Sequence, residues 1–116
     1  MKLSKIAKKL QLQIITPSVL SDVPDSEITT IYTGDLLSDI MGNAPDECLI
    51  VTIQAHKNTV AVATLKDSPA IIICNNRQIS EEMKLAATSE KIIIFKTDKN
   101  QYEISGLLYT LLNRNQ

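Results

Sequence analysis

Four short segments of this chain are rich in β-forming residues, and each one ends in a polar cluster that leads directly into a helical segment. Three of them, residues 49–54, 70–74 and 92–96, are nearly continuous in apolar residues. Such short apolar runs are typical of strands that are buried on both faces, as in a parallel sheet covered by helices. The fourth, residues 29–33, is rich in Ile, Thr and Tyr and is also expected to be extended. The pattern therefore predicts an α/β fold.

The order of the segments predicts how they connect. From residue 49 onward the order is β-α-β-α-β-α, and parallel strands joined by right-handed crossovers follow from it. With a further short strand at residues 12–16, we expect a mostly parallel sheet of about five strands flanked by helices, in a single domain spanning residues 1–116. Gly106 lies inside the last predicted helix, residues 100–113, and indicates a close backbone contact there.

Polar residues in front of the helical segments predict where the helices begin. Asp35 is expected to cap a short helix that Gly42 ends, and Asn58 and Ser80 are expected to cap the next two. Asn100 and the glutamate three residues later have the spacing of a capping box for the last helix. Capping alone would explain why Asp35 and Asn58 stand where they do.

Composition excludes several classes of function. Twelve Lys and Arg against 13 Asp and Glu give a net charge of −1, which argues against a nucleic-acid-binding protein. No apolar stretch approaches the roughly 20 residues needed to span a membrane, and no signal peptide is recognisable. Two cysteines, Cys48 and Cys74, have no metal-type spacing and fit a reduced cytoplasmic setting. Three glycines cannot build a P-loop or a dinucleotide-binding loop, so no cofactor is implied.

Candidate ligand-binding residues follow the predicted strands. In an open α/β sheet, the carboxyl ends of parallel strands form the crevice in which ligands bind, so polar residues there are candidates for contact with a ligand. We expect no catalytic apparatus among them. The candidates are Gly34, Asp35, His56, Asn58, Asn75, Asn76, Arg77 and Asp98.

Each candidate also has a purely structural explanation. His56, the single histidine, could contact a ligand or act as an acid or base, or it could simply hydrogen-bond to backbone at a strand–helix junction. Asn75 and Asn76 could make a turn, because asparagine tolerates left-handed backbone. Alternatively, Arg77 could bind a carboxylate or phosphate presented at the crevice.

Three segments resemble the DRTGG domain family. They are DLLSDIMGN at residues 35–43, TIQAHKNTVAVATL at 52–65 and TDKNQYEISGLLY at 97–109. The resemblance covers about residues 3–113, essentially the whole chain. The chain departs from the namesake motif, because His56-Lys57 stand in place of its Asp-Arg pair and residues 74–76 in place of its Thr-Gly-Gly.

The resemblance implies a domain similar to the N-terminal domain of HPr kinase. In that family the domain accompanies phosphotransacetylases and CBS-containing pyrophosphatases as a non-catalytic regulatory or dimer-forming module, and stand-alone members are often encoded near iron-only hydrogenases. It therefore implies a homodimeric regulatory domain that senses a small ligand such as a nucleotide or phosphorylated metabolite. The alternatives are a pure protein–protein interaction module of redox or fermentative metabolism and an enzyme that uses His56.

Overall fold

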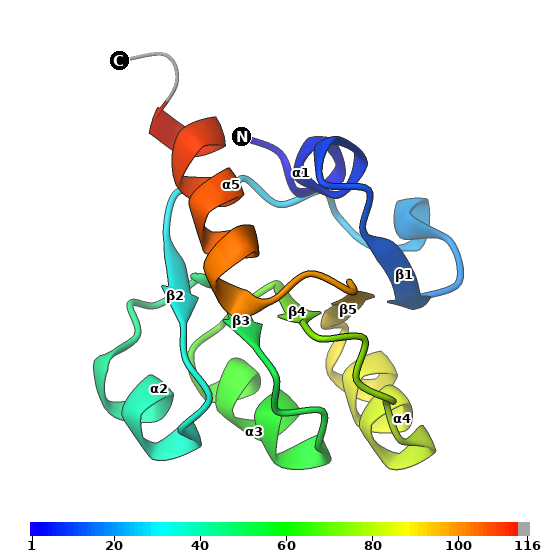
Figure 1. Ribbon diagram of the computed structural model, residues 1–116. Coiled ribbons are helices and arrows are strands. Elements are labelled where there is room, and N and C mark those ends of the chain that lie inside the picture. The colour runs from blue at the N-terminus through cyan, green and yellow to red at the C-terminus, as the bar shows by residue number, and fades with distance from the viewer. Residues whose placement is uncertain (114–116) are drawn as a thin grey trace.

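The computed structural model describes residues 1–113, in which a five-stranded sheet lies between two layers of helices (Figure 1). The strand order is β1-β5-β4-β3-β2. The strands are β1 (Gln13–Thr16), β2 (Ile31–Thr33), β3 (Leu49–Thr52), β4 (Ala70–Ile73) and β5 (Ile93–Lys96). The helices are α1 (Leu3–Lys9), η1 (Leu20–Asp22), α2 (Leu37–Asn43), α3 (Lys57–Leu65), α4 (Glu81–Glu90) and α5 (Gln101–Asn113). The predicted fold class is confirmed, whereas the assignment of residues 1–116 to one DRTGG-like domain stays a prediction and includes three residues outside those described.

The parallel part of the sheet follows the order of the chain. Strands β2, β3, β4 and β5 lie side by side and parallel, joined in turn by α2, α3 and α4. Strand β1 completes the sheet by pairing antiparallel with β5, with Gln13 opposite Lys96. Because the four parallel strands point the same way, their carboxyl ends all lie at one edge of the sheet.

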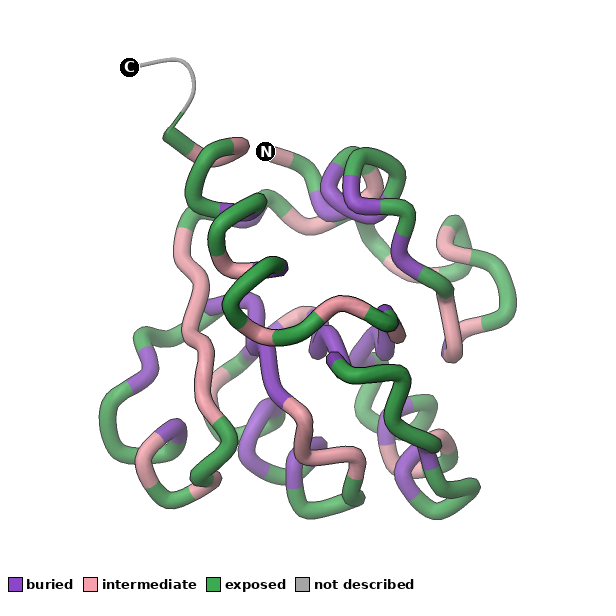
Figure 2. Tube along the Cα trace, in the orientation of Figure 1, coloured by how far each residue is buried: buried purple, intermediate pink, exposed green. Residues whose placement is uncertain are grey.

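Two separate apolar cores form on the two faces of the sheet. Helices α1 and α5 cover one face, where Phe95 and Ile72 are buried, and α2, α3 and α4 cover the other, where Ile71 and Ile73 are buried (Figure 1). Side chains of one strand alternate between faces, so a strand covered on both sides is apolar at every position. The centre of the sheet is accordingly the most continuously buried part of the chain (Figure 2).

Two of the predicted helix caps are confirmed. The Ser80 hydroxyl accepts a hydrogen bond of 3.1 Å from the Met83 N–H at the start of α4. At the start of α5, the Asn100 side chain accepts from the Glu103 N–H at 2.8 Å, and the Glu103 carboxylate accepts from the Asn100 N–H at 3.3 Å. This reciprocal pair is a capping box.

The caps predicted from Asp35 and Asn58 are wrong. Helix α2 begins two residues after Asp35, behind Leu36, and has no side-chain cap, while Gly42 lies inside it. The burial of Ile40 fixes this helix on the sheet, and packing of that kind overrides a cap preference. Asn58 lies within α3, whose cap is His56. The contact expected at Gly106 is also wrong, because a Cβ added there would have nothing within 4 Å.

Candidate functional site

The carboxyl ends of the parallel strands bring the predicted site residues to one edge of the sheet. Gly34 and Asp35 follow β2, His56 follows β3, Asn76 follows β4 and Asp98 follows β5. Two of them, Asn76 and Asp98, line one hollow at this edge, and the others lie outside it. Which of them contacts a ligand stays a prediction.

The connections that follow β4 and β5 diverge. After β4 the chain turns to α4 on one face, whereas after β5 it turns to α5 on the opposite face (Figure 1). In open α/β sheets, the crevice beyond neighbouring strands whose connections leave to opposite faces is the usual place for a ligand. The sheet therefore has one such point among the described residues, at the carboxyl ends of β4 and β5.

Backbone hydrogen bonds hold the two diverging connections together. The Asn75 N–H donates to the Lys99 carbonyl at 2.9 Å, and the Asn76 N–H donates to the Thr97 carbonyl at 2.8 Å. Both asparagines have left-handed backbone, with φ of 63° and 52°. Asparagine adopts this conformation more readily than most residues. The predicted turn-making role of Asn75 and Asn76 is therefore confirmed, and their side chains are exposed.

A polar hollow of about 440 Å³ opens beside this point, and we call it the switch-point hollow. It contains two of the predicted residues, Asn76 and Asp98. Lys96 and Lys99 are half-buried in its wall, and among residues 1–113 neither takes part in an ion pair. The full lining consists of Leu10, Gln11, Gln13, Asn76, Lys96, Thr97, Asp98 and Lys99.

Sequence reasoning missed Gln11, Gln13, Lys96 and Lys99. The two glutamines precede or begin β1, and only the antiparallel pairing of β1 with β5 brings them beside the lysines. Two lysines near the end of one predicted strand were a usable signal, because a cation at the carboxyl edge of a sheet can bind an anionic ligand.

The remaining candidates lie outside the switch-point hollow. The Gly34 N–H donates to the Val51 carbonyl at 3.1 Å, and the Asp35 carbonyl accepts from the Gln54 side chain at 2.7 Å. Arg77 is exposed beyond the turn that follows β4. These contacts give Gly34 and Asp35 a structural role in joining β2 to β3.

His56 caps helix α3. Its backbone is extended and its Nδ1 accepts a hydrogen bond of 3.1 Å from the Asn58 N–H. An imidazole nitrogen that accepts a hydrogen bond carries no proton, so this contact requires the tautomer with hydrogen on Nε2. The imidazole is solvent-exposed and satisfies a backbone donor that the helix itself leaves free.

We expect His56→Ala to lower the free energy of unfolding by about 1 kcal/mol, the typical cost of losing a helix cap. His56→Asn should retain most of that stability, because asparagine is a good capping residue. Urea denaturation followed by circular dichroism measures both. Equal losses in the two variants would contradict the capping role.

Both cysteines are buried and lack a polar environment that would activate them. Cys74, directly after β4, has no exposed surface, and burial raises the pKa of its thiol to about 11. Burial also raises the pKa of the Cys48 thiol, against an opposing hydrogen bond with Ser68. A nucleophilic cysteine needs the opposite shift, so both behave as small apolar core residues.

The fold is similar to that of a known regulatory region. A solved structure of the CBS and DRTGG domains of the regulatory region of Clostridium perfringens pyrophosphatase, complexed with its activator diadenosine tetraphosphate, matches 91% of this chain with a TM-score of 0.69 and 12% sequence identity. The likeness is one of fold. It supports the expected DRTGG-like architecture, and the chain spans 45% of the length of that structure.

The other comparisons are negative. No family model matches the chain, and no curated protein matches it. Membership of the DRTGG family therefore stays a prediction. Within residues 1–113, no helix is both long and apolar enough to cross a membrane, and no group of three His, Cys, Asp or Glu could hold a metal ion.

Proposed function

We propose that this protein is a non-catalytic regulatory domain that senses a small phosphorylated ligand, such as a nucleotide, at the carboxyl edge of its sheet. The observation that carries the proposal is the switch-point hollow, which joins the end of β5 to a turn containing Asn76 and is lined almost entirely by polar residues. Specific ligand sites in α/β sheets form at this kind of place.

Two further observations support a sensing role rather than a catalytic one. The similar solved structure is a regulatory region of an enzyme, in complex with a nucleotide activator. In this chain, the acid or base that catalysis by the edge residues would use, His56, has Nδ1 engaged in capping α3. With its two buried thiols, the domain fits a reduced, cytoplasmic setting.

A thermal-shift screen of nucleotides, phosphorylated metabolites and carboxylates tests this function. A ligand present at 100 times its dissociation constant is expected to stabilise the protein by about 2.7 kcal/mol, because it binds the folded state alone. Such a stabilisation is readily detected as a rise in Tm. A panel in which no compound raises Tm would contradict the proposal.

Variants at the turn after β4 locate the ligand. Asn76→Gly removes a side chain that lines the hollow, and Asn75→Gly removes its neighbour, which does not line it. Glycine accepts the left-handed backbone of both positions, so neither change introduces strain. We expect the ligand-induced rise in Tm to shrink in Asn76→Gly and to persist in Asn75→Gly.

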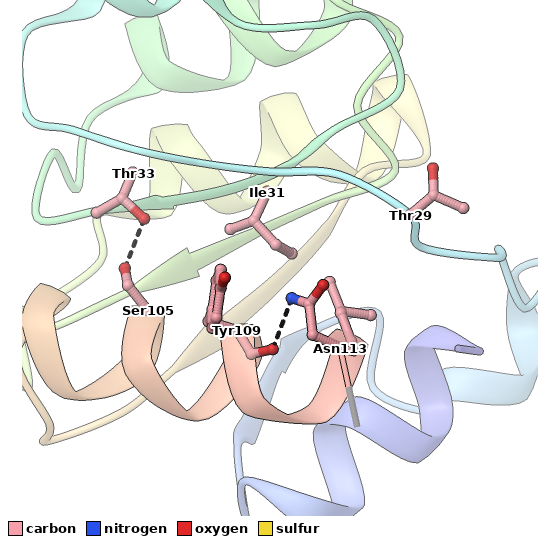
Figure 3. A pocket seen from close by; sticks show the side chains of 7 residues that line it. Thr29, Ile31, Thr33, Ser105, Tyr109 and Asn113 are labelled. Carbon is pink, nitrogen blue, oxygen red and sulfur yellow. Dashed lines mark hydrogen bonds between the residues drawn. The ribbon is translucent and has the colours of Figure 1, made fainter. Parts of the chain in front are cut away.

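We further propose that the domain is a homodimer through a surface formed by β2 and α5, here called the β2–α5 surface. Strand β2 is an edge strand, so half of its backbone groups face away from the sheet. A hollow of about 380 Å³ lies between β2 and α5 (Figure 3). The two elements are joined there by a hydrogen bond of 2.6 Å between the hydroxyls of Thr33 and Ser105. The lining residues are Thr29, Ile31, Thr33, Ser105, Tyr109, Leu112 and Asn113.

The β2–α5 surface lacks the charges that normally protect an edge strand. Residues 28–34 contain no charged side chain, and α5 has a single one, Glu103. Helix α5 nevertheless exposes Tyr109 (72%), which lines the hollow, and Tyr102 (87%), seven residues earlier on the same face of the helix. An uncharged, partly aromatic surface pairs with a copy of itself without electrostatic repulsion, and two edge strands related by a two-fold axis can join antiparallel.

Tyr109→Lys is expected to convert the dimer into a monomer. In a two-fold dimer each subunit contributes one lysine, so two positive charges would be buried in the same interface. Tyr109 is exposed in the protomer, so the change leaves the fold intact. Leu85→Lys adds the same charge at an exposed residue of α4 and should leave the dimer unchanged. Size-exclusion chromatography with light scattering at micromolar concentration measures the mass. A wild-type monomer would contradict dimerisation.

The β2–α5 surface also favours a second candidate function, a protein–protein interaction module without a small ligand. An exposed edge strand beside an uncharged helix can accept a strand from another protein. The two candidates differ in the thermal-shift screen. If the domain is an interaction module, no small molecule should raise its Tm. A pull-down with the wild type should then recover a partner protein, and a pull-down with Tyr109→Lys should not.

A further inference from the structure

The switch-point hollow has a second polar hollow beside it, and the two share a wall. The second hollow, of about 370 Å³, lies between β1, β5 and the start of α4. Gln13 and Lys96 line both, because they oppose each other across the antiparallel pair. The residues found in the second hollow alone are Ile15, Gln78, Ile79, Ser80, Glu81 and Lys84.

The lysines of the two hollows differ in whether a carboxylate compensates their charge. In the second hollow, Lys84 is paired with Glu81 at 3.2 Å, so its charge is compensated. Lys96 and Lys99 have no carboxylate within ion-pair distance among the described residues, although Asp98 lies between them in the chain and lines the same hollow at its exposed rim. Two half-buried lysines against one exposed aspartate leave the switch-point hollow with a net positive charge.

Neutral hydrogen-bond donors complete the lining. The side-chain amides of Gln11, Gln13 and Asn76 each carry an NH₂ group that can donate two hydrogen bonds. Lysine binds phosphate oxygens as a point charge, and amide donors fix the orientation of the group. Apolar contact is limited to Leu10, so the lining offers little surface on which an aromatic ring could bind.

We propose that the switch-point hollow binds the pyrophosphate-type portion of the sensed ligand, with Lys96 and Lys99 as its cationic contacts and Gln11, Gln13 and Asn76 as its donors. This assignment rests on the proposed function and adds the chemistry of the group that is bound. Asp98 opposes the anion and lowers its affinity. The second hollow extends the site for a ligand longer than the phosphate chain.

Titration with sodium pyrophosphate at constant ionic strength, followed by amide-resolved NMR, tests the proposal on the intact chain. Saturable chemical-shift changes are expected at Asn76 and at residues 11–13 and 96–99. The double variant Lys96→Gln, Lys99→Gln should raise the dissociation constant at least about tenfold, the effect of losing charge-assisted hydrogen bonds. Saturable changes confined to other parts of the chain would overturn the assignment.

A charge-matched control distinguishes a specific pyrophosphate site from general electrostatic attraction between the anion and the protein. Lys66→Gln with Lys91→Gln removes the same charge at the ends of α3 and α4, on the opposite edge of the sheet. It should change the dissociation constant by no more than about twofold, because charges at the far edge of the sheet are largely screened by solvent and salt. Equal weakening in both double variants would overturn the proposal.

Asp98→Asn should change the affinity for pyrophosphate in the opposite direction. It removes an exposed carboxylate without disturbing the fold, and pyrophosphate should bind more tightly to this variant. Weaker binding would overturn the proposed role of the hollow as an anion site. If pyrophosphate fails to bind while another compound stabilises the wild type and not Asn76→Gly, the anion assignment fails and the sensing function stands. If nothing binds, both fail.

Discussion

Phe95→Ala is expected to lower the free energy of unfolding by about 3–5 kcal/mol, the range for truncating a fully buried phenylalanine. Phe95 is the only phenylalanine of the chain and has no exposed surface. It is buried in the core formed by the sheet with α1 and α5, and it pairs with Ile72 in β4 and Ile14 in β1. Its loss leaves a cavity where three strands meet.

Urea denaturation measures this effect, and Phe95→Leu is its matched control. Leucine fills part of the space that alanine leaves empty, so its loss of stability should be clearly smaller. Because Phe95 immediately precedes Lys96, the alanine variant should also weaken whatever binds in the switch-point hollow. A loss below about 1 kcal/mol in Phe95→Ala would mean that this core readily collapses around the cavity.

Local patterns were sufficient to predict the sheet. The runs that became β3, β4 and β5 are apolar except at the last position of β3 and of β5, because both faces of each strand are buried. The caps at Ser80 and Asn100 were predictable for a similar reason, since side chain and backbone donor are only three residues apart. The prediction at Asp35 failed because packing of Ile40 decides where α2 begins.

The candidate site was predicted only in part. Asn76 and Asp98 were found because each follows a strand that the sequence reveals. Gln13 was missed because it meets Lys96 only through the pairing of the first strand with the last, a contact between distant segments that leaves no local pattern. The two lysines at the end of β5 did leave a local signal, and it was not used. Likewise, the opposite directions of the connections after β4 and β5 depend on which face α5 covers, which its sequence alone does not specify.

Alkaline pH is expected to destabilise the protein through Cys74. Its thiol titrates near pH 9 when exposed, but burial raises the pKa to about 11 in the folded state. Between these values the unfolded chain has lost the proton that the folded chain retains, so stability is complete below pH 9 and falls as the pH rises. Raising the pKa of the thiol from 9 to about 11 on folding corresponds to a loss of about 2 kcal/mol in the free energy of unfolding by pH 11.

The comparison with Cys74→Ala isolates this contribution, because every other ionisable group is present in both proteins. The alanine variant should be less stable at neutral pH, since it leaves a small cavity, yet its stability should fall less steeply between pH 8 and pH 10.5. Denaturation at a series of pH values gives both slopes. Parallel slopes would contradict the shifted pKa and would mean that water reaches the end of β4 beneath the Asn75-Asn76 turn. A steeper wild-type slope indicates instead that water does not reach the buried thiol at the end of β4 in the folded protein.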